Sequence, residues 1–439
     1  MKDEEILSIL DYWNFWGKEQ DTGIERANYL NTILPFLKTN NAVVITGVRR
    51  SGKSVIMTQV AKRLIDSGLD PKSTLIINFE DYRFYNISLI LLQQVYELYL
   101  RKLSPVKDRM LFLDEIHKIE GWERFVRTLL DKKEAKIIVS GSNSNLIAEE
   151  YATLLTGRHV KILVFPLSFK ELLQFKNVDI STELKIVAEK IKIKRFLDEY
   201  LKFGGFPEVV LADEKAKEKL IADYIDSILT KDVAERHKIK RKTKLMELAR
   251  YYLTNVANKI SFNKLKEPLE LPLRTIERFS YYLEEAYLLF FLKRFSFKVK
   301  EQSKANRKVY AVDTGLANIY GFRASQDIGR IIENAVFIEM LKKNANNPNF
   351  EIYYWQNPQG KEVDFVIKHR SEIIELMQVC YDAENIETKK RELNALVNAS
   401  EELKCKNLTV ITWDYEESEK IKGKKIKFIP LWKWLLEMK

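Results

Sequence analysis

Short apolar runs alternate with helical patterns along the first part of the chain. The runs have the length of buried strands and lie at residues 42–45, 75–79, 110–113, 136–140 and 160–165. Between them, apolar residues recur at helical spacing, at residues 55–65, 87–103 and 122–131. Strands that alternate with helices predict a parallel sheet covered by helices on both faces. We therefore predict an α/β core over residues 1–175, with a helical lead-in before residue 40.

The next segment, residues 176–243, is mostly helical and then strongly basic. Gly204-Gly205-Phe206-Pro207 interrupts the helical pattern, and paired glycines followed by a proline predict a turn. We interpret the segment as a small helical lid over the nucleotide, followed by a basic connector at 231–244. Lys240 and Arg241 of the connector either contact DNA or belong to a solvated helix end.

Residues 244–322 show the pattern of a winged helix. The predicted helices cover 245–258, 261–265 and 272–286, and two β-rich segments, 288–299 and 309–312, flank a polar stretch as in a wing hairpin. Ser261 is a suitable N-cap, and Pro272 suits the first turn of the third helix. That helix would enter a DNA major groove with Arg274 and Arg278 on one face. A winged helix can equally mediate protein contacts.

Residues 323–439 are predicted to form a further α/β domain. A helix at 331–343 precedes strands at 352–355, 363–367, 375–380 and 408–412, with another helix at 386–398. About a hundred residues is an ordinary length for a domain. The chain contains no run of 18 or more apolar residues, so we expect no membrane span.

The stretch from Gly47 to Ser54, GVRRSGKS, matches the phosphate-binding loop pattern G-x-x-x-x-G-K-[ST] at every specified position. It lies between a predicted strand and a predicted helix, whose N-terminus favours anions. Lys53 is expected to reach the outer phosphates of ATP, and Ser54 to hold Mg²⁺. Arg50 either contacts phosphate or faces solvent. The predicted nucleotide-binding residues are Gly47, Arg50, Ser51, Gly52, Lys53, Ser54 and Val55.

Two acids, Asp114 and Glu115, follow the apolar run at 110–113. In nucleotide triphosphatases with such a loop, the first acid belongs to the magnesium shell and the second can polarise the attacking water. We therefore predict that Asp114 binds magnesium and that Glu115 is the general base. An apolar strand ending in two acids is common on its own, and the upstream loop is what favours catalysis here.

Composition narrows the class of protein. The 439 residues are 46% hydrophobic and 31% charged, which is typical of a globular protein. The charged N-terminus lacks a secretory signal, and two cysteines give no disulfide framework, so we expect a cytoplasmic protein. The formal net charge of +11 favours a polyanionic partner such as DNA, although lysine-rich surfaces also occur in proteins from hot environments.

In combination, these motifs resemble a group of AAA-type ATPases, frequent in archaea, whose C-terminal domain is related to the PD-(D/E)xK nuclease fold. The resemblance spans most of the chain. Besides the loop and the acid-tipped strand, it rests on 139–143, 156–158, 165–169, 204–207, 312–316 and 360–365, which read VSGSN, TGR, FPLSF, GGFP, VDTGL and GKEVDF.

The resemblance implies further roles around the nucleotide. Ser142 or Asn143 would be the polar sensor that contacts the γ-phosphate and orients the attacking water. Arg158 would be an arginine finger acting on a neighbouring subunit, which implies a ring or spiral homo-oligomer. An ion pair within the chain is the alternative for Arg158.

The nuclease-like domain departs from the pattern of its fold. Glu333 (or Glu339, which cannot face the same metal) would supply the helix acid, and Asp364 the strand acid. Gln378 stands where a second strand acid is usual, and Cys380 where a lysine is usual. We therefore expect weak or no cutting, unless a lysine from elsewhere, such as Lys361 or Lys368, takes that role.

We predict a Mg²⁺-dependent ATPase that couples its nucleotide state to DNA binding or remodelling. The alternatives are an ATP-operated switch or scaffold that grips a protein partner, and an active DNA nuclease.

Overall fold

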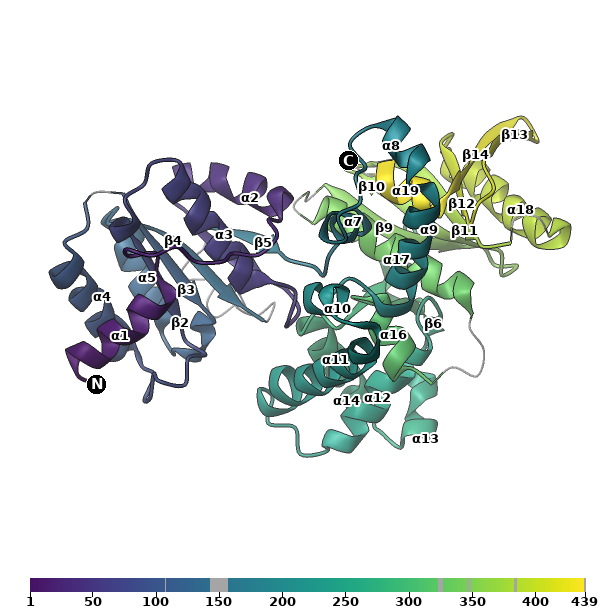
Figure 1. The fold of residues 1–439 in the computed structure, drawn as a ribbon. Coiled ribbons are helices and arrows are strands. Elements are labelled where there is room, and N and C mark those ends of the chain that lie inside the picture. The colour runs from purple at the N-terminus through teal and green to yellow at the C-terminus, as the bar shows by residue number, and fades with distance from the viewer. Residues whose placement is uncertain are drawn as a thin grey trace. The chain divides into compact units, whose positions relative to one another are not determined.

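The computed structural model describes residues 1–106, 108–142, 157–322, 327–345, 347, 349–382 and 385–437. The chain divides into two compact units, 1–164 and 165–439 (Figure 1).

The first unit is built on a five-stranded parallel sheet in the order β2-β3-β4-β1-β5. Its strands are β1 (Ala42–Thr46), β2 (Thr74–Asn78), β3 (Arg109–Asp114), β4 (Ala135–Gly141) and β5 (His159–Leu163). Its helices are α1 (Asp3–Trp13), α2 (Ala27–Ile33), α3 (Lys53–Asp66), α4 (Leu89–Leu103) and α5 (Trp122–Asp131), with 3-10 turns at Leu34–Lys38, Pro71–Ser73 and Ile116–Lys118.

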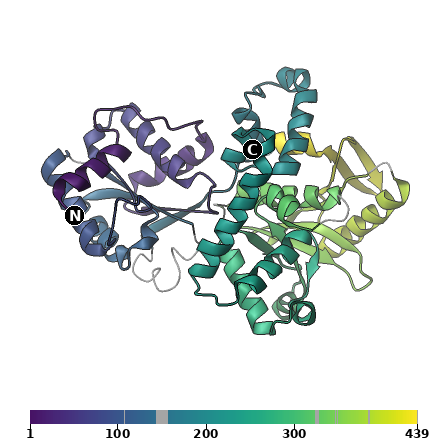
Figure 2. The same ribbon diagram turned by 60° about the horizontal axis from the view of Figure 1, so that its bottom comes forward.

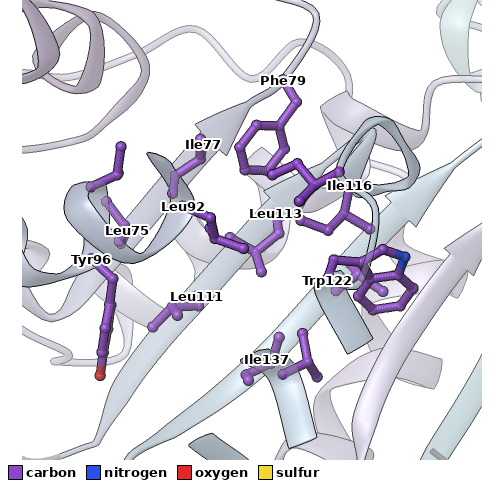
Figure 3. Packing of buried hydrophobic residues seen from close by; sticks show 14 of the residues in the cluster. Leu75, Ile77, Phe79, Leu92, Tyr96, Leu111, Leu113, Ile116, Trp122 and Ile137 are labelled. Carbon is purple, nitrogen blue, oxygen red and sulfur yellow. The ribbon is translucent and has the colours of Figure 1, made fainter. Parts of the chain in front are cut away.

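Alternate residues of each strand face opposite layers of helices. Val44 packs into a core with α1, α4 and α5, whereas Val43 and Ile45 pack into a second core with α2 and α3. Figure 3 shows the first core, where Leu111 and Leu113 of β3 point to the same side as Ile77 of β2. The predicted parallel sheet with helices on both faces is confirmed.

The second unit begins with a run of helices. They are α7 (Phe169–Phe175), α8 (Glu183–Ala188), α9 (Lys190–Phe203), α10 (Pro207–Leu211), α11 (Glu214–Ser227) and a π-helix at Ile228–Glu235. Helix α9 packs on α16 (Thr314–Tyr320) and α17 (Ile328–Asn344), and these teal and green helices lie together in both views (Figure 1 and Figure 2). The predicted lid helices are therefore built into the second unit, and a role over the nucleotide stays a prediction.

The turn predicted at Gly204–Pro207 separates α9 from α10 and is fastened to a distant residue. Gly205 N donates to Asp313 Oδ2 over 2.7 Å. Gly204 has a φ of +76°, and a Cβ built on it would lie 1.7 Å from the Asp313 carboxylate. Only glycine fits at this close approach.

The segment predicted as a winged helix contains α12 (Lys242–Thr254), a 3-10 turn (Phe262–Leu265), α13 (Lys266–Leu269), α14 (Leu273–Glu285) and α15 (Val299–Lys304). Strands β6 (Lys259–Ile260), β7 (Leu289–Leu292) and β8 (Arg307–Ala311) form an antiparallel sheet in the order β6-β8-β7. We call β6, β7 and β8 the three-stranded module.

Three local predictions in this segment were wrong. The Ser261 side chain caps no helix, because a 3-10 turn follows it directly. The helical segment predicted at 261–265 does not end there but continues into α13, a four-residue helix short enough to keep Pro268 in its first turn. The stretch predicted as an open wing loop holds α15 and the start of β8, so the strand after β7 begins earlier than expected.

The remaining residues form a six-stranded sheet in the order β13-β14-β12-β11-β10-β9. Its elements are β9 (Phe350–Gln356), β10 (Glu362–His369), β11 (Glu372–Cys380), α18 (Ile386–Leu403), β12 (Leu408–Thr412), β13 (Glu417–Ile421), β14 (Lys424–Pro430) and α19 (Leu431–Glu437). Strands β9, β10 and β11 are antiparallel, whereas β11, β12 and β14 are parallel. Apolar residues of α18 cover one face of this sheet.

Candidate functional sites

The phosphate-binding loop follows β1 and ends at α3, as its pattern predicts. Gly47 has a φ of +144°, and a Cβ built on it would lie 2.1 Å from the carbonyl oxygen of Val164. Gly52, at a φ of +94°, is the N-cap of α3. Arg26 steadies the loop by donating from Nη1 to Ser51 O over 2.9 Å. The two glycines thus let the backbone turn tightly enough for its amides to face an anion.

Lys53 is buried, and its ammonium lies over its own loop. Nζ donates to Gly47 O over 3.0 Å and to Val48 O over 3.2 Å. Both acceptors are backbone carbonyls, which carry no formal charge. Burial raises the pKa values of Asp114 and Glu115, and the charge of the Lys53 ammonium opposes this shift.

Asp114 and Glu115 are buried where β3 ends, and Ser140 of the neighbouring strand β4 joins them. The Ser140 hydroxyl donates to Asp114 Oδ1 and accepts from Glu115 N, the latter over 3.0 Å. Ser54 of the loop lies near the Asp114 side chain and favours its ionised form. The Asp114 carboxylate thus lies near the Ser54 hydroxyl of the phosphate-binding loop. Both groups are of the kind that binds metal ions.

Burial dominates the electrostatics of both acids. It raises the pKa of Asp114, against the hydrogen bond from Ser140, the nearby Ser54 and the charge of Lys53. Burial also raises the pKa of Glu115 to about 7, with Lys53 opposing and Asp114 adding to the shift. A carboxyl with a pKa near 7 is suited to accept a proton at neutral pH.

Further charged groups surround the mouth of the loop. Glu80 Oε1 lies 3.4 Å from Arg49 Nη1 and 3.6 Å from Lys118 Nζ. His117 Nδ1 lies 3.1 Å from Glu115 Oε2. Glu80 and His117 did not figure in the predictions, because no motif marks them.

The other predicted residues of this site fall in different places. Ser51 is buried, Val55 is 45% exposed on the first turn of α3, and Arg50 is exposed with a left-handed backbone (φ 68°). Ser142 is buried, whereas Asn143 lies outside the described residues.

Arg158 forms an ion pair with Asp131, and both side chains are about half exposed. The structure thus shows the ion pair within the chain, which was the alternative to the arginine finger.

Ser140 was missed as a functional candidate. It is a buried polar residue near the end of a largely apolar strand, Ala135–Gly141, and that exception is the signal that could have revealed it. A buried hydroxyl in such a strand needs hydrogen-bond partners, and here it finds both acids.

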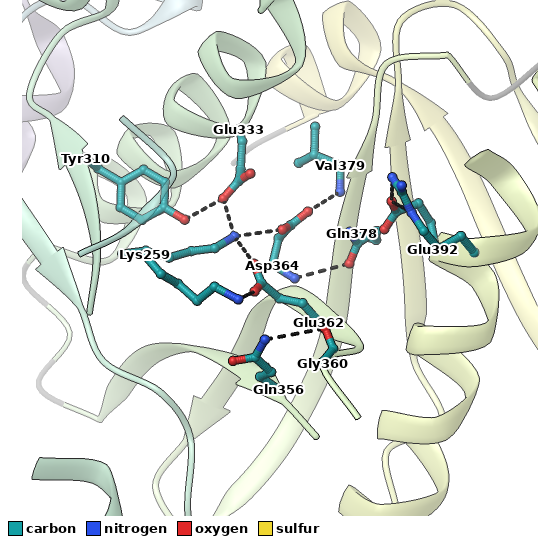
Figure 4. A network of polar contacts seen from close by, with 12 residues as sticks. Lys259, Tyr310, Glu333, Gln356, Gly360, Glu362, Asp364, Gln378, Val379 and Glu392 are labelled. Atoms are coloured by element: carbon teal, nitrogen blue, oxygen red, sulfur yellow. Dashed lines mark hydrogen bonds and ion pairs between the residues drawn. The ribbon is translucent and has the colours of Figure 1, made fainter. Parts of the chain in front are cut away.

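The predicted nuclease-like residues also come together, in the second unit (Figure 4). Asp364 Oδ2 accepts from Val379 N over 3.0 Å, and Gln378 Oε1 accepts from Asp364 N over 3.1 Å. Gln378 Nε2 in turn donates to Glu392 Oε2 over 2.7 Å. Glu333 approaches Asp364 from α17.

A lysine that the predictions missed lies at the centre of this cluster. Lys308 Nζ of β8 is 2.7 Å from Glu333 Oε1, 2.7 Å from Glu362 Oε1 and 2.9 Å from Asp364 Oδ1. We call these four residues the Lys308 cluster. Its carboxylates converge on an ammonium, and the described part of the chain contains no group of three or more His, Cys, Asp or Glu placed to hold a metal ion.

The lysines proposed from the sequence lie elsewhere. Lys368 pairs with Glu351 over 2.6 Å, and Lys361 is exposed. Cys380 is buried, which raises the pKa of its thiol to about 11, so it supplies no cation. Glu339 belongs to a different network, accepting from Tyr200 Oη over 2.6 Å and from Lys342 Nζ over 2.8 Å.

Three family models and two related proteins match this chain over most of its length. An AAA domain matches residues 39–173, and two domains of unknown function, DUF8612 and DUF4143, match 194–326 and 328–434. An uncharacterized protein of Methanocaldococcus jannaschii is 36% identical over 409 residues, which cover 90% of this chain and 88% of the relative. The chain belongs to the family of this protein. An uncharacterized protein of Haemophilus influenzae is 33% identical over 420 residues, which cover 94% of this chain and 99% of that relative.

The N-terminal unit of this chain has the fold of a P-loop AAA ATPase core. Solved structures are similar at lower levels. An ORC1 protein of Aeropyrum pernix in complex with DNA has a TM-score of 0.31 at 14% identity, covering 72% of this chain and 94% of that one. AMPPCP-bound DnaA from Aquifex aeolicus has a TM-score of 0.27 at 15% identity, covering 59% and 88%. At such TM-scores these likenesses carry no argument about function.

The residues predicted to contact DNA lie at the surface of the second unit. Arg274 and Arg278 are exposed on α14, and Lys240 and Arg241 are exposed just before α12. A cavity of about 440 Å³ is also lined by α14, through Glu277, Tyr281 and Glu284 among others. No helix in the described ranges combines the length and apolar composition needed to cross a bilayer.

Proposed function

We propose that the protein binds ATP with Mg²⁺ and hydrolyses it at the loop between β1 and α3. One observation supports this above the others: Ser140 holds Asp114 and Glu115 together where β3 ends, and Ser54 and Lys53 of the loop favour the ionised form of Asp114. A hydroxyl and a carboxylate are oxygen ligands of the kind that Mg²⁺ prefers. These residues therefore fit the metal that an AAA domain uses.

Each residue of the site has a distinct proposed role. The backbone amides of 47–54 and the N-terminus of α3 bind the phosphates, and Lys53 turns from its loop carbonyls to the outer phosphate oxygens. Ser54 and Asp114 would hold Mg²⁺, which offsets charge on the phosphates when bound. Glu115 accepts a proton from the attacking water. Ser140 fixes the position of Glu115 relative to Asp114.

The test separates binding from hydrolysis. Glu115→Gln should keep ATP affinity, measured by calorimetry, and lower the rate of phosphate release by about 10²–10⁴-fold. Lys53→Ala should abolish binding itself, because the charge facing the phosphates is lost. Glu120→Gln, an exposed acid five residues further on, is the matched control and should keep the parental rate. A Glu115→Gln protein that hydrolyses ATP at the parental rate would refute the assignment.

We further propose that the nucleotide state is coupled to DNA through a winged helix formed by α12–α14 and the three-stranded module. The support is the net charge of +11 and the exposure of Arg274, Arg278, Lys240 and Arg241. Arg274→Ala with Arg278→Ala should weaken DNA binding and make its salt dependence shallower, by about 0.9 in log–log slope for each phosphate that is no longer neutralised. Lys215→Ala with Lys219→Ala, an exposed pair at the same spacing on α11, is the charge-matched control.

The 440 Å³ cavity supports a second candidate, an ATP-operated switch that grips a protein partner along α14. It is lined by apolar side chains such as Phe262 and Phe291, together with the carboxylates Glu277 and Glu284. Lys304 and Arg307 also line it, so its charges are mixed, and an apolar lining with charges of both signs suits a protein segment. The absence of any salt-sensitive DNA binding at low ionic strength would favour this switch.

We also propose that the C-terminal domain is a binding platform and does not cleave DNA. The support is that Lys308, and no metal-type constellation among the described residues, faces Glu333 and Asp364. Mg²⁺- or Mn²⁺-dependent DNA cleavage that Asp364→Ala abolishes and Lys53→Ala leaves intact would contradict this. A ring or spiral homo-oligomer with Arg158 as its finger would require Arg158 to leave Asp131.

A further inference from the structure

The Lys308 ammonium is buried in protein yet close to several carboxylates. Its side chain is 3% exposed, and three acidic oxygens lie within 2.9 Å of Nζ. Tyr310, two residues on along β8, donates to the same Glu333 oxygen over 2.6 Å. An ammonium has three donors, and here each has a carboxylate acceptor.

Charge in the cluster is close to balanced. Burial alone would lower the pKa of Lys308, but the carboxylates of Asp364 and Glu333 raise it well above its usual value. Burial, followed by the charge of Asp364, raises the pKa of Glu333 to about 8. With Glu333 protonated, Glu362 and Asp364 face two lysines, because Lys259 Nζ also lies 2.7 Å from Glu362 Oε2.

The cluster joins parts of the chain that are distant in sequence. Lys259, Lys308 and Tyr310 come from β6 and β8 of the three-stranded module, Glu333 from α17, and Glu362 and Asp364 from β10. One neutral contact reinforces the junction: Ala311 of β8 exchanges backbone hydrogen bonds of 2.8 and 3.0 Å with the Asn334 side chain. One buried cation therefore lies where the module meets both α17 and β10.

The carboxylate oxygens that face the centre of the cluster already accept hydrogen bonds. Asp364 uses Oδ1 for Lys308 and Oδ2 for Val379 N, and Glu333 Oε1 accepts from both Lys308 and Tyr310. An added cation could reach these atoms only after Lys308 had been withdrawn.

We propose that Lys308 is a built-in cation that locks the three-stranded module onto α17 and β10, so that the carboxylates of the nuclease-like domain are closed to outside ligands while the module is docked. Removing one partner of a buried ion pair is strongly destabilising, because the remaining charge has neither water nor a counter-ion. The module is thus the element whose release would open the site.

The experiment is hydrogen exchange by mass spectrometry on the full chain. Lys308→Met keeps an unbranched side chain that is only one atom shorter and removes its charge. It should speed amide exchange in β8, α17 and β10 by at least about tenfold, while β1–β4 of the first unit exchange as in the parent. Lys259→Met is the matched control, since Lys259 is one-third exposed, and it should change these rates far less.

A second variant distinguishes a charge lock from simple packing. Lys308→Met combined with Asp364→Asn removes one charge of each sign and leaves Glu362 paired with Lys259. It should restore most of the parental protection, and it remains decisive if Lys308→Met alone does not fold. Parental exchange rates in Lys308→Met, or exchange in the double variant as fast as in the single one, would overturn the proposal.

Discussion

The two units each bury a lysine among acids, but the two lysines have different partners. The Lys53 ammonium donates to the carbonyls of Gly47 and Val48. The Lys308 ammonium instead forms ion pairs with three carboxylates. Asp114 accepts a hydrogen bond from the Ser140 hydroxyl, which in turn accepts one from the backbone of Glu115. The first cluster therefore keeps charge available for an incoming ligand, and the second satisfies its charge internally.

Lysine replacement should separate the two clusters most clearly. Lys308→Met should lower the free energy of unfolding by about 3–5 kcal/mol, because it leaves the buried Asp364 carboxylate without a counter-ion. Lys53→Met should cost less, about 1–3 kcal/mol, because only hydrogen bonds to carbonyls are removed, while ATP binding disappears. Urea denaturation and calorimetry on both variants check this. Equal losses of stability would show that the comparison is mistaken.

Ser140 offers a finer test of how the first cluster is organised. Ser140→Ala should lower kcat about 10–100-fold with little change in the KM for ATP, because it frees Glu115 without removing a phosphate ligand. Ser142→Ala, two residues further along, tests the alternative, in which Ser142 is the polar sensor. If Ser142→Ala lowered kcat and Ser140→Ala did not, the sensor role expected of Ser142 from the sequence would be favoured over a positioning role for Ser140.

The pH dependence of stability should reveal the raised pKa of Glu333 in the second cluster. The pKa of Glu333 is raised to about 8 in the folded chain, against about 4.3 for an unfolded glutamate. The folded state therefore binds the extra proton between these values. Its contribution to stability is full below about pH 4 and falls by at most about 1.4 kcal/mol per pH unit up to pH 8.

Glu333→Gln should flatten this part of the curve, since an amide does not titrate. Chemical denaturation at a series of pH values measures it. Glu351→Gln is a useful contrast, because the Lys368 ammonium holds the pKa of Glu351 below its usual value and the effect would have the opposite sign. An unchanged slope in Glu333→Gln would show that Glu333 is already ionised in the folded protein.

The smallest effect on stability is expected at Arg158. Its ion pair with Asp131 is half exposed, so Arg158→Ala should cost less than about 1 kcal/mol. Thermal unfolding measures the loss. If hydrolysis nevertheless fell by orders of magnitude, and Asp131→Ala left it intact, Arg158 would be acting as a finger on a neighbouring subunit.

The sequence alone predicted the first unit well, because its information is local. Strand, glycine loop and helix are adjacent along the chain, and Asp114 and Glu115 follow one another at the end of a single strand. Ser140 was missed because its role depends on strand order, in which β4 lies next to β3. No pattern within residues 135–141 indicates that β3 is the strand beside β4.

The second unit was harder to predict for the same physical reason. The expected carboxylates, Glu333 and Asp364, do meet, but the cation between them comes from a strand that the sequence suggested was a wing loop. Lys361 and Lys368 were nearer in sequence and therefore better candidates. Burial of Lys308 follows from tertiary packing alone, since nothing about its neighbours in the chain marks it as inaccessible.

Hydrogen bonds join residues before position 328 to residues after it. They bear on where the chain can be divided into fragments. Matches to two family models meet between residues 326 and 328, which looks like a place to divide the protein. A fragment that started at 328 would keep Glu333 and Asp364 but lose Lys308, Tyr310 and the backbone of Ala311. A division at residue 328 therefore separates β8 from its buried partners on α17 and β10.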